Sequence, residues 1–365
     1  MAIEKIHIES FLSLAKKIPV IDVRSPGEYD HAHIPGAYSL PLFTNEERAV
    51  VGTAYKQESR EKAIKLGLDF FGPKMKSMIE EVEKICGSKL TGSSKSILLY
   101  CWRGGMRSGA VGWLLDVYGF KVYTLVGGYK KYRNYVLTSL INPFNFKILG
   151  GYTGSGKTEV LKELKKNREP IIDLENIAKH KGSAFGNIGM PKQPSQEMFE
   201  NLVSEELRKL SYKQQQSDHY EFDIMHPPIW LEDESQRIGL VNIPNDLWKT
   251  MRNSHIYFLD IPFEERLKHI TEEYGVLDKE RIIEAISRIR ERLGGLQAKN
   301  ATQLLQEGNI VESFRILLKY YDKWYTKALH NREKINSLLH TINCLSVTPE
   351  NAKKLTQQAV YHEKP

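Results

Sequence analysis

A cysteine followed closely by two arginines and two glycines is the first stretch of this chain that could carry chemistry. Cys101 opens the heptapeptide CWRGGMR, which lies between a predicted buried strand over 96–100 and a predicted helix over 109–118. At a strand-to-helix turn, backbone N–H groups can surround an anion, and nearby cations lower the pKa of a thiol. We therefore predict that Cys101 is a nucleophilic thiolate. The predicted anion-binding loop consists of Trp102, Arg103, Gly104, Gly105, Met106 and Arg107.

The alternative interpretation of Cys101 is a buried structural cysteine, but its charged and glycine-rich neighbours argue against that reading. Cys86 and Cys344 lack such neighbours and are expected to be unreactive. Three widely spaced cysteines also argue against a disulfide framework and a zinc site, so no metal-binding site is predicted from them. This cysteine usage is typical of a cytoplasmic protein.

A second stretch, GYTGSGKT, has the G-x-x-x-x-G-K-T spacing of a P-loop. An apolar run over 146–151 precedes it as a predicted strand, and EVLKELKKN follows as a predicted helix. In this setting, glycines let backbone N–H groups face phosphates, the lysine reaches the outer phosphates and the threonine can ligate magnesium. The bound group could be ATP or another diphosphate. The predicted phosphate-binding residues are Gly151, Thr153, Gly154, Ser155, Gly156, Lys157 and Thr158.

Three aspartates follow or end short apolar runs that are predicted to be strands of the same sheet. Asp173, Asp223 and Asp260 lie in the runs 170–174, 220–225 and 255–261. Any of them could hold magnesium beside the P-loop, and the alternative is that they cap strand ends. Two further stretches, 178–189 and 225–239, are predicted to be loops that contact substrate. Their candidate contacts are His180, Ser183, Glu234, Ser235 and Arg237.

Strands that alternate with helices in both halves predict an α/β protein with two parallel sheets. We place one domain at residues 1–138 and a P-loop domain with a helical C-terminal extension at 139–365. The segment 42–94 is longer than a connection requires, and it is either a set of amphipathic helices or an insertion that faces substrate. Beyond residue 262 an apolar helical stripe is accompanied by arginines, which predicts a solvated basic face or a contact with RNA backbone.

Charge and hydropathy exclude some classes of protein and only weakly favour others. The chain has 52 basic and 45 acidic residues, for a net charge of +7. That excess mildly favours a polyanionic partner such as RNA. A run of about 18 apolar residues, which would predict a membrane span, does not occur. We therefore expect no membrane association.

Several ordered motifs of the first domain resemble those of rhodanese domains over roughly residues 5–137. They are DVRSPGEYDHAHIPGA, YCWRGGMRS and the closing LVGGY. One feature departs from that family, because the loop from Cys101 to Arg107 has C-x5-R spacing and one residue more than is usual for rhodaneses. This longer loop resembles that of related phosphatases and arsenate reductases, which leaves phosphatase chemistry open.

The order of the two domains, together with YCWRGGMRSG, GGYTGSGKT, LENIAKHKGSAFG and EDESQRIG, resembles the tRNA 2-selenouridine synthases. The resemblance implies a transferase that modifies the wobble uridine of tRNA. In that family a 2-thiouridine is S-geranylated from geranyl diphosphate, and selenium from selenophosphate then displaces the geranylthio group. It implies that Cys101 carries selenium as an S-selanyl group while Arg103, Arg107 and the loop hold the phosphate.

The resemblance also implies tRNA with wobble 2-thiouridine, selenophosphate and geranyl diphosphate as partners, no tightly bound cofactor, and a cytoplasmic location. That the P-loop binds the diphosphate of the geranyl donor, with or without magnesium, is a hypothesis, because the motif suits a nucleotide equally well. The alternatives are a Cys-dependent phosphatase or rhodanese-type sulfurtransferase fused to a nucleotide-binding module, and a non-enzymatic protein whose two motifs only bind anions.

Overall fold

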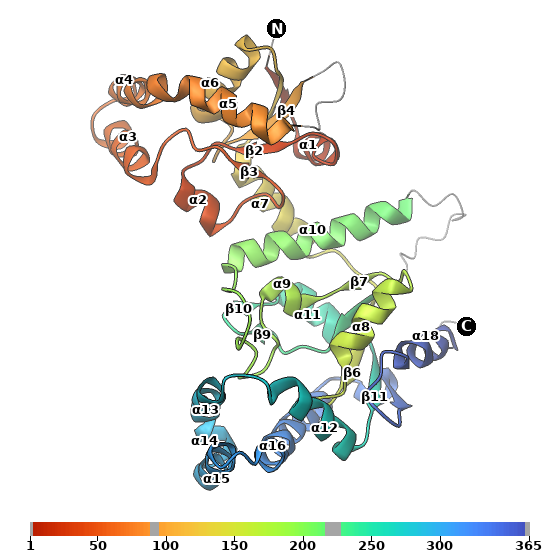
Figure 1. Ribbon diagram of the computed structural model, residues 1–365. Coiled ribbons are helices and arrows are strands. Elements are labelled where there is room, and N and C mark those ends of the chain that lie inside the picture. The colour runs from red at the N-terminus through yellow and green to blue at the C-terminus, as the bar shows by residue number, and fades with distance from the viewer. Residues whose placement is uncertain (1–2, 88–94, 216–227, 362–365) are drawn as a thin grey trace. The chain divides into compact units, whose positions relative to one another are not determined.

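The computed structural model describes residues 3–87, 95–215 and 228–361 of the chain (Figure 1). It divides into two compact units. The first comprises Met1–Ser139 and Glu200–Leu202, and the second comprises Leu140–Phe199 and Val203–Pro365. Within the described residues, no helix is long and apolar enough to cross a membrane.

The first unit is built on a five-stranded parallel sheet with the strand order β1-β5-β4-β2-β3. Its strands are β1 (Glu4–Ile6), β2 (Val20–Asp22), β3 (Tyr38–Ser39), β4 (Ser96–Tyr100) and β5 (Lys121–Leu125). Its helices are α1 (Ile8–Leu14), α2 (Pro26–His31), α3 (Asn45–Gln57), α4 (Arg60–Phe71), the 3-10 turn η1 (Gly72–Lys74), α5 (Met75–Cys86), α6 (Met106–Val117) and α7 (Gly128–Ser139).

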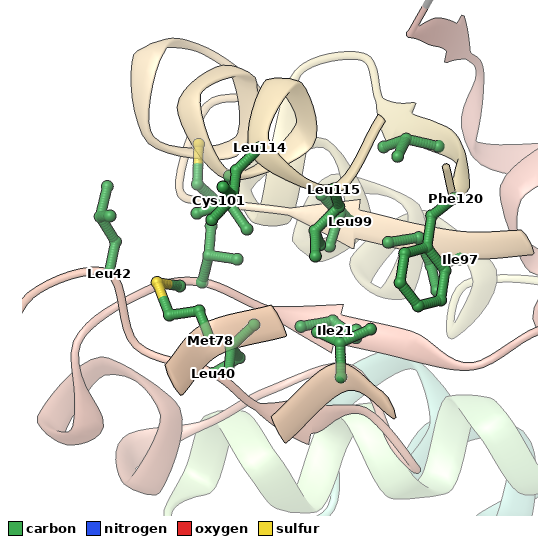
Figure 2. Packing of buried hydrophobic residues seen from close by; sticks show 14 of the residues in the cluster. Ile21, Leu40, Leu42, Met78, Ile97, Leu99, Cys101, Leu114, Leu115 and Phe120 are labelled. Carbon is green, nitrogen blue, oxygen red and sulfur yellow. The ribbon is translucent and has the colours of Figure 1, made fainter. Parts of the chain in front are cut away.

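The central strand β4 leads directly into the Cys101 loop, as predicted, and it is buried over Ile97–Tyr100 between β2 and β5. Figure 2 shows Cys101 within the apolar core, towards the end that contains Leu42 and away from Phe120. The predicted strand over 122–128 was too long. It ends at Leu125 because Gly127 and Gly128 take φ values of +77° and +56°, and Gly128 begins α7.

The long segment between the two halves of the sheet forms three helices, α3, α4 and α5. The Thr44 side chain and Glu47 form a reciprocal capping box that starts α3, and Ser59 caps α4. Helices α3 and α4 pack against one another. Each helix buries only a few small or aromatic residues, such as Ala54, Ala63 and Phe71. One face of the pair therefore stays accessible beside the Cys101 loop.

The second unit has a five-stranded parallel sheet in the order β12-β11-β6-β8-β7. The strands are β6 (Phe146–Gly151), β7 (Ile171–Ile172), β8 (Ile229–Glu232), β11 (His255–Asp260) and β12 (Leu339–Asn343), and β9 (Arg237–Ile238) with β10 (Val241–Asn242) forms a small antiparallel pair. The helices are α8 (Lys157–Lys166), α9 (Leu174–Ala178), α10 (Gln196–Gln215), α11 (Asn245–Arg252), α12 (Phe263–Tyr274), α13 (Lys279–Arg288), α14 (Arg290–Leu293), α15 (Gly295–Gln306), α16 (Ile310–His330), α17 (Ile335–Leu338) and α18 (Asn351–Tyr361).

The sheet of the second unit differs from its prediction in two strands. The stretch 225–239 is not simply a loop, because it contains the buried strand β8, which pairs with β6. Its apolar run, Ile229–Leu231, is short and is followed at once by acidic residues, so the strand has little signal of its own. Strand β12 was not predicted. The predicted strand over 220–225, with Asp223, lies outside the described residues.

The helical region beyond residue 262 has its own apolar core, as its periodicity predicted. Ile282, Ile286, Ile289 and Leu293 are buried in one cluster, whereas the neighbouring arginines are exposed. One of these arginines, Arg288, donates to the carbonyl oxygen of Ala184 at 2.9 Å. The basic face therefore has at least one structural role.

Candidate functional site

The loop after β4 is held by backbone contacts that require glycine at two positions. Gly104 and Gly128 both have positive φ. A Cβ atom on Gly104 would lie 2.4 Å from the carbonyl oxygen of Leu125, and one on Gly128 would lie 2.3 Å from that of Cys101. The N–H of Tyr129 donates to the Cys101 carbonyl at 2.8 Å. The glycines of the loop and of LVGGY thus let two turns pack backbone against backbone.

The electrostatic setting of Cys101 differs from that of the other two cysteines. Burial alone would raise the pKa of the Cys101 thiol. Hydrogen bonds from the Ser108 hydroxyl and from the backbone at Ser108 and Gly105, with the charge of Arg107, outweigh burial and lower this pKa below its ordinary value. The sulfur lies 3.3 Å from the Ser108 Oγ. For Cys86 and Cys344, burial raises the pKa. A lowered pKa favours the thiolate form that a nucleophile needs, so Cys101 is the cysteine best suited to that role.

The two loop arginines have different surroundings. Arg107 forms a bidentate pair with Glu28, with Nη1–Oε2 at 2.7 Å and Nη2–Oε1 at 3.3 Å. Arg103 is exposed and makes no ion pair with any residue that the structure describes. The Arg107 guanidinium is thus paired with Glu28, whereas Arg103 has no such partner within the described residues, and both arginines line the cavity beside Cys101. That both hold an anion stays a prediction.

The DVR motif, residues 22–24, stabilises the turn that packs on the Cys101 loop. Asp22 and Arg24 are almost completely buried and form an ion pair of 2.6 Å. Arg24 also donates to the carbonyl oxygen of Ala32 and stacks on the Tyr129 ring at 3.8 Å. Tyr129 follows Gly128 in the turn that packs on the Cys101 loop. The motif is thus a buried scaffold rather than a part of the reacting surface.

We expect Arg24→Ala to destabilise the first unit by roughly 3–5 kcal/mol, because it leaves the Asp22 carboxylate buried without a partner. Chemical denaturation followed by circular dichroism measures the change. Arg48→Ala is the control, since Arg48 is half exposed and pairs with Glu28 at 3.6 Å, a kind of pair worth about 0–1 kcal/mol. Equal effects of the two substitutions would contradict the structural role of Arg24.

A cavity of about 900 Å³ opens beside Cys101. Its walls come from α3, α4 and the loop from Cys101 to Arg107, and they include all loop residues except Gly104. The predicted insertion over 42–94 therefore does face the reactive cysteine with two of its three helices.

The P-loop follows β6 and starts α8, as its spacing predicted. Gly154 and Gly156 have positive φ, and Lys157 is the first residue of α8. The Lys157 Nζ donates to the Gly151 carbonyl at 3.1 Å. The Ser155 Oγ is buried and has no hydrogen-bond partner among the described residues. These are groups that an incoming phosphate oxygen can satisfy.

The P-loop lines a second cavity, with a volume of about 820 Å³, and three glutamates line it as well. Glu175, Glu232 and Glu234 each place a carboxylate oxygen within 4.8 Å of the others. Burial raises the pKa of Glu175 to about 7 and that of Glu232 to about 8, and the pKa of Glu234 is also well above its usual range. Repulsion from Glu175 adds to the shifts of Glu232 and Glu234, and repulsion from Asp173 adds to that of Glu175. The charge of Lys157 opposes all three shifts.

This arrangement fits a divalent cation such as magnesium. Carboxylate oxygens are the ligands that magnesium prefers, and Glu232 is 2 % exposed with its Oε1 lacking a hydrogen-bond partner among the described residues. Glu232 ends β8, which is the strand next to β6. The predicted aspartates are placed differently. Asp173 lines the cavity but caps α9, and Asp260 lies outside the lining residues.

The sequence predicted substrate contact for the run 225–239 that contains Glu232, but it did not place Glu232 at the end of a strand, and it did not identify Glu175. Glu232 directly follows the apolar run IWL, and recognition of that run as a strand would have placed a carboxylate at its end. Glu175 carried no comparable signal. Of the candidate substrate contacts, Ser183, Glu234 and Ser235 line the cavity, whereas His180 and Arg237 do not. His180 is buried, and Arg237 donates to the Gly239 carbonyl at 2.9 Å.

The raised pKa values predict how stability depends on pH. The folded second unit keeps protons on Glu175, Glu232 and Glu234 that the unfolded chain loses above a pKa of about 4.5. Without divalent cations, its stability should therefore fall as pH rises from about 4.5 to about 8, by roughly a few kcal/mol. Magnesium should reverse part of this loss at pH 8. Thermal melts with EDTA or magnesium measure both effects.

Glu232→Gln should flatten the pH dependence and reduce the stabilisation by magnesium. Glu163→Gln should leave both unchanged, because Glu163 is a partly exposed residue of α8 that does not line this cavity. Identical melts of the wild type with EDTA and with magnesium at pH 8 would argue against a cation at these carboxylates.

Several aromatic side chains, here called the aromatic wall, also line the cavity at the P-loop. Trp248, Tyr274, Tyr321, Trp324 and Tyr325 are among its lining residues. The Tyr325 hydroxyl donates to Asp233 at 2.6 Å and accepts from the Gly151 N–H at 3.2 Å. The cavity thus joins a phosphate-binding loop to a surface that can pack an apolar or aromatic group.

Two family models and several curated proteins are similar to this chain. The family model described as tRNA 2-selenouridine synthase AAA domain matches residues 144–343, and the rhodanese-like domain model matches residues 9–135. A tRNA 2-selenouridine synthase of Bdellovibrio bacteriovorus is 31% identical over 91% of this chain and 94% of its own length. The one from Hydrogenovibrio crunogenus is 34% identical over 87% and 91%.

A third relative, the tRNA 2-selenouridine synthase of Nitrosomonas europaea, is 37% identical over 70% of this chain. The match spans 63% of that relative, which is less than two thirds of its length.

Proposed function

The chain belongs to the tRNA 2-selenouridine synthase family, and from this premise we propose that it replaces sulfur by selenium in wobble 2-thiouridine of tRNA. The reaction has two steps, each assigned to one unit. The second unit transfers a geranyl group from geranyl diphosphate to the sulfur of 2-thiouridine. The first unit then exchanges the geranylthio group for selenium from selenophosphate. The observation that carries the proposal is the lowered thiol pKa of Cys101 within an anion-binding loop.

In the geranylation step, the sulfur of 2-thiouridine attacks C1 of geranyl diphosphate. A C–S bond forms, the C–O bond breaks, pyrophosphate leaves with the electron pair, and the N3 proton of the base passes to water. Lys157 and the P-loop N–H groups stabilise the charge that builds on the leaving group. A divalent cation held by Glu175, Glu232 and Glu234 would neutralise further charge on the diphosphate. The aromatic wall beside the P-loop supports a prenyl donor, because it offers apolar surface to the chain.

In the selenation step, the Cys101 thiolate first forms a mixed disulfide with a thiol, by exchange with a catalytic amount of the disulfide form of that thiol. The selenium of selenophosphate attacks the Cys101 sulfur, an S–Se bond forms, and the S–S bond breaks with its electron pair on the departing thiolate. Water then attacks phosphorus, so that the Se–P bond breaks, phosphate leaves and selenium stays on Cys101. Arg103 and the loop N–H groups hold the phosphorus oxygens. The selenium then attacks C2 of the uridine and expels geranylthiolate, and a thiol takes the Cys101 sulfur as a disulfide to release 2-selenouridine. The Ser108 hydroxyl and the charge of Arg107 favour the thiolate that starts this sequence.

The proposal is tested by incubating the protein with 2-thiouridine tRNA, geranyl diphosphate, selenophosphate and a thiol, followed by mass spectrometry of the nucleosides. We expect S-geranyl-2-thiouridine when selenophosphate is omitted and 2-selenouridine when all components are present. Selenation of 2-thiouridine without geranyl diphosphate would contradict the two-step order. Hydrolysis of an aryl phosphate, lost in Cys101→Ser, would instead support the phosphatase alternative.

A further inference from the structure

The cavity beside Cys101 is larger than the transfer of a single selenium atom requires. Its volume of about 900 Å³ is within the range of about 300–1,000 Å³ that is typical of sites for whole small molecules. Every lining residue lies between Leu42 and Ala110, so the first unit forms this cavity by itself. The cavity is therefore large enough to hold a small-molecule group of its own.

Large apolar side chains are exposed to solvent around this cavity. Leu68 is 56 % exposed, Met106 51 %, Tyr55 51 % and Trp102 39 %, and all four line it. Exposed apolar groups that gather at one hollow are typical of a binding site for an apolar ligand. The buried part of the cavity wall is also apolar and includes Phe43, Phe71 and Ala63.

Cations also line the cavity. Lys56, Arg60 and Arg103 are exposed, and within the described part of the chain none of them forms an ion pair. The wall thus combines an apolar surface with unpaired positive charges. This combination fits a ligand whose apolar chain is attached to a polyanion, with the anion at the rim.

We propose that this cavity binds the ten-carbon chain of S-geranyl-2-thiouridine during selenation, an inference that rests on the proposed function. When selenium bonds to C2, the C2–S bond breaks, and the geranylthiolate leaves with the electron pair and takes a proton from water. The chain is attached to that departing sulfur. It must therefore lie beside the atom that Cys101 delivers, and the apolar cavity is at that position. The rim cations hold the phosphates of the RNA.

The test uses the full-length protein and two anticodon stem-loop RNAs, with either S-geranyl- or S-methyl-2-thiouridine. Binding is measured by fluorescence anisotropy without a selenium donor. Leu68→Gln alters the exposed cavity wall, and Leu137→Gln is the matched control, because Leu137 is 48 % exposed on α7 and does not line this cavity. We expect wild type and Leu137→Gln to prefer the geranyl RNA by at least about tenfold, and Leu68→Gln to lose most of that preference.

Selenation of the same RNAs with selenophosphate and a thiol separates this inference from the proposed function. A lower geranyl-to-methyl ratio of selenation rates in Leu68→Gln than in Leu137→Gln supports the inference. An equal ratio in the two variants overturns it and places the chain elsewhere, such as the cavity by the P-loop. If neither RNA is selenated but Leu68→Gln still weakens geranyl-dependent binding, the proposed function fails while the chain-binding cavity stands.

Discussion

Cys101→Ala is expected to abolish the conversion of S-geranyl-2-thiouridine into 2-selenouridine, with a loss of at least about a thousandfold in rate. The substitution removes the atom that bonds selenium, and no other cysteine can replace it. Cys86 and Cys344 are buried, and burial raises the pKa of both thiols. Geranylation should continue in this variant, because it is assigned to the other unit. Mass spectrometry of nucleosides, with and without selenophosphate, measures both steps.

Cys86→Ala is the matched control, since it removes a buried cysteine from the same core. It should retain selenation if the variant remains folded, which circular dichroism checks. Alkylation with iodoacetamide gives an independent measurement. Cys101 should react at a lower pH than an ordinary thiol, because its pKa is lowered by Ser108 and by backbone hydrogen bonds at Ser108 and Gly105. Selenation at the normal rate by Cys101→Ala would falsify the carrier role of this residue.

Lys157→Ala is expected to reduce geranylation by about a hundredfold to a thousandfold, since it removes a preorganised charge from the diphosphate leaving group. Selenation of an RNA that already carries S-geranyl-2-thiouridine should be largely retained. Cys101→Ala should therefore lose selenation and keep geranylation, whereas Lys157→Ala should lose geranylation and keep selenation. Rates of S-geranyl-2-thiouridine formation from geranyl diphosphate provide the measurement.

Lys166→Ala is the control for this prediction. Lys166 lies at the other end of α8, is exposed and pairs with Glu163 at 2.9 Å. Its loss should leave geranylation unchanged. If Lys157→Ala geranylates tRNA at the wild-type rate, the P-loop does not bind the prenyl donor. A nucleotide would then be the better candidate, and binding of ATP to the wild type but not to Lys157→Ala would show it.

The structure also changes the interpretation of Arg107. Its position in the loop predicted a direct contact with the bound anion. In the structure, Glu28 from α2 pairs with its guanidinium at two points, and this pair lowers the pKa of Glu28 despite the burial of that carboxylate. The charge of Arg107 also contributes to the lowered pKa of Cys101. A direct contact of Arg107 with the anion stays a prediction. A pairing between residues 79 positions apart has no signature in the local sequence.

Short contiguous motifs in the sequence predicted much of the fold and identified two candidate sites, the Cys101 loop and the P-loop. The Cys101 loop and the P-loop are each formed by neighbouring residues, and their glycines, charges and flanking apolar runs are sufficient to predict a turn between a strand and a helix. The alternation of strands and helices likewise predicted two parallel sheets, which the structure confirms. Strand β8 was missed because three apolar residues beside an acidic run carry too little periodicity to be recognised.

By itself, the sequence determined which atoms can react: a thiol at position 101 and a phosphate-binding loop from Gly151 to Thr158. Only the tertiary structure decided what surrounds them. Glu175 and Glu232 meet because β7 and β8 pair in parallel, so that α9, which follows β7, begins beside the end of β8. The apolar cavity exists because α3 and α4 pack beside the Cys101 loop. Both depend on contacts between segments distant in the chain, and such contacts follow from packing rather than from local spacing.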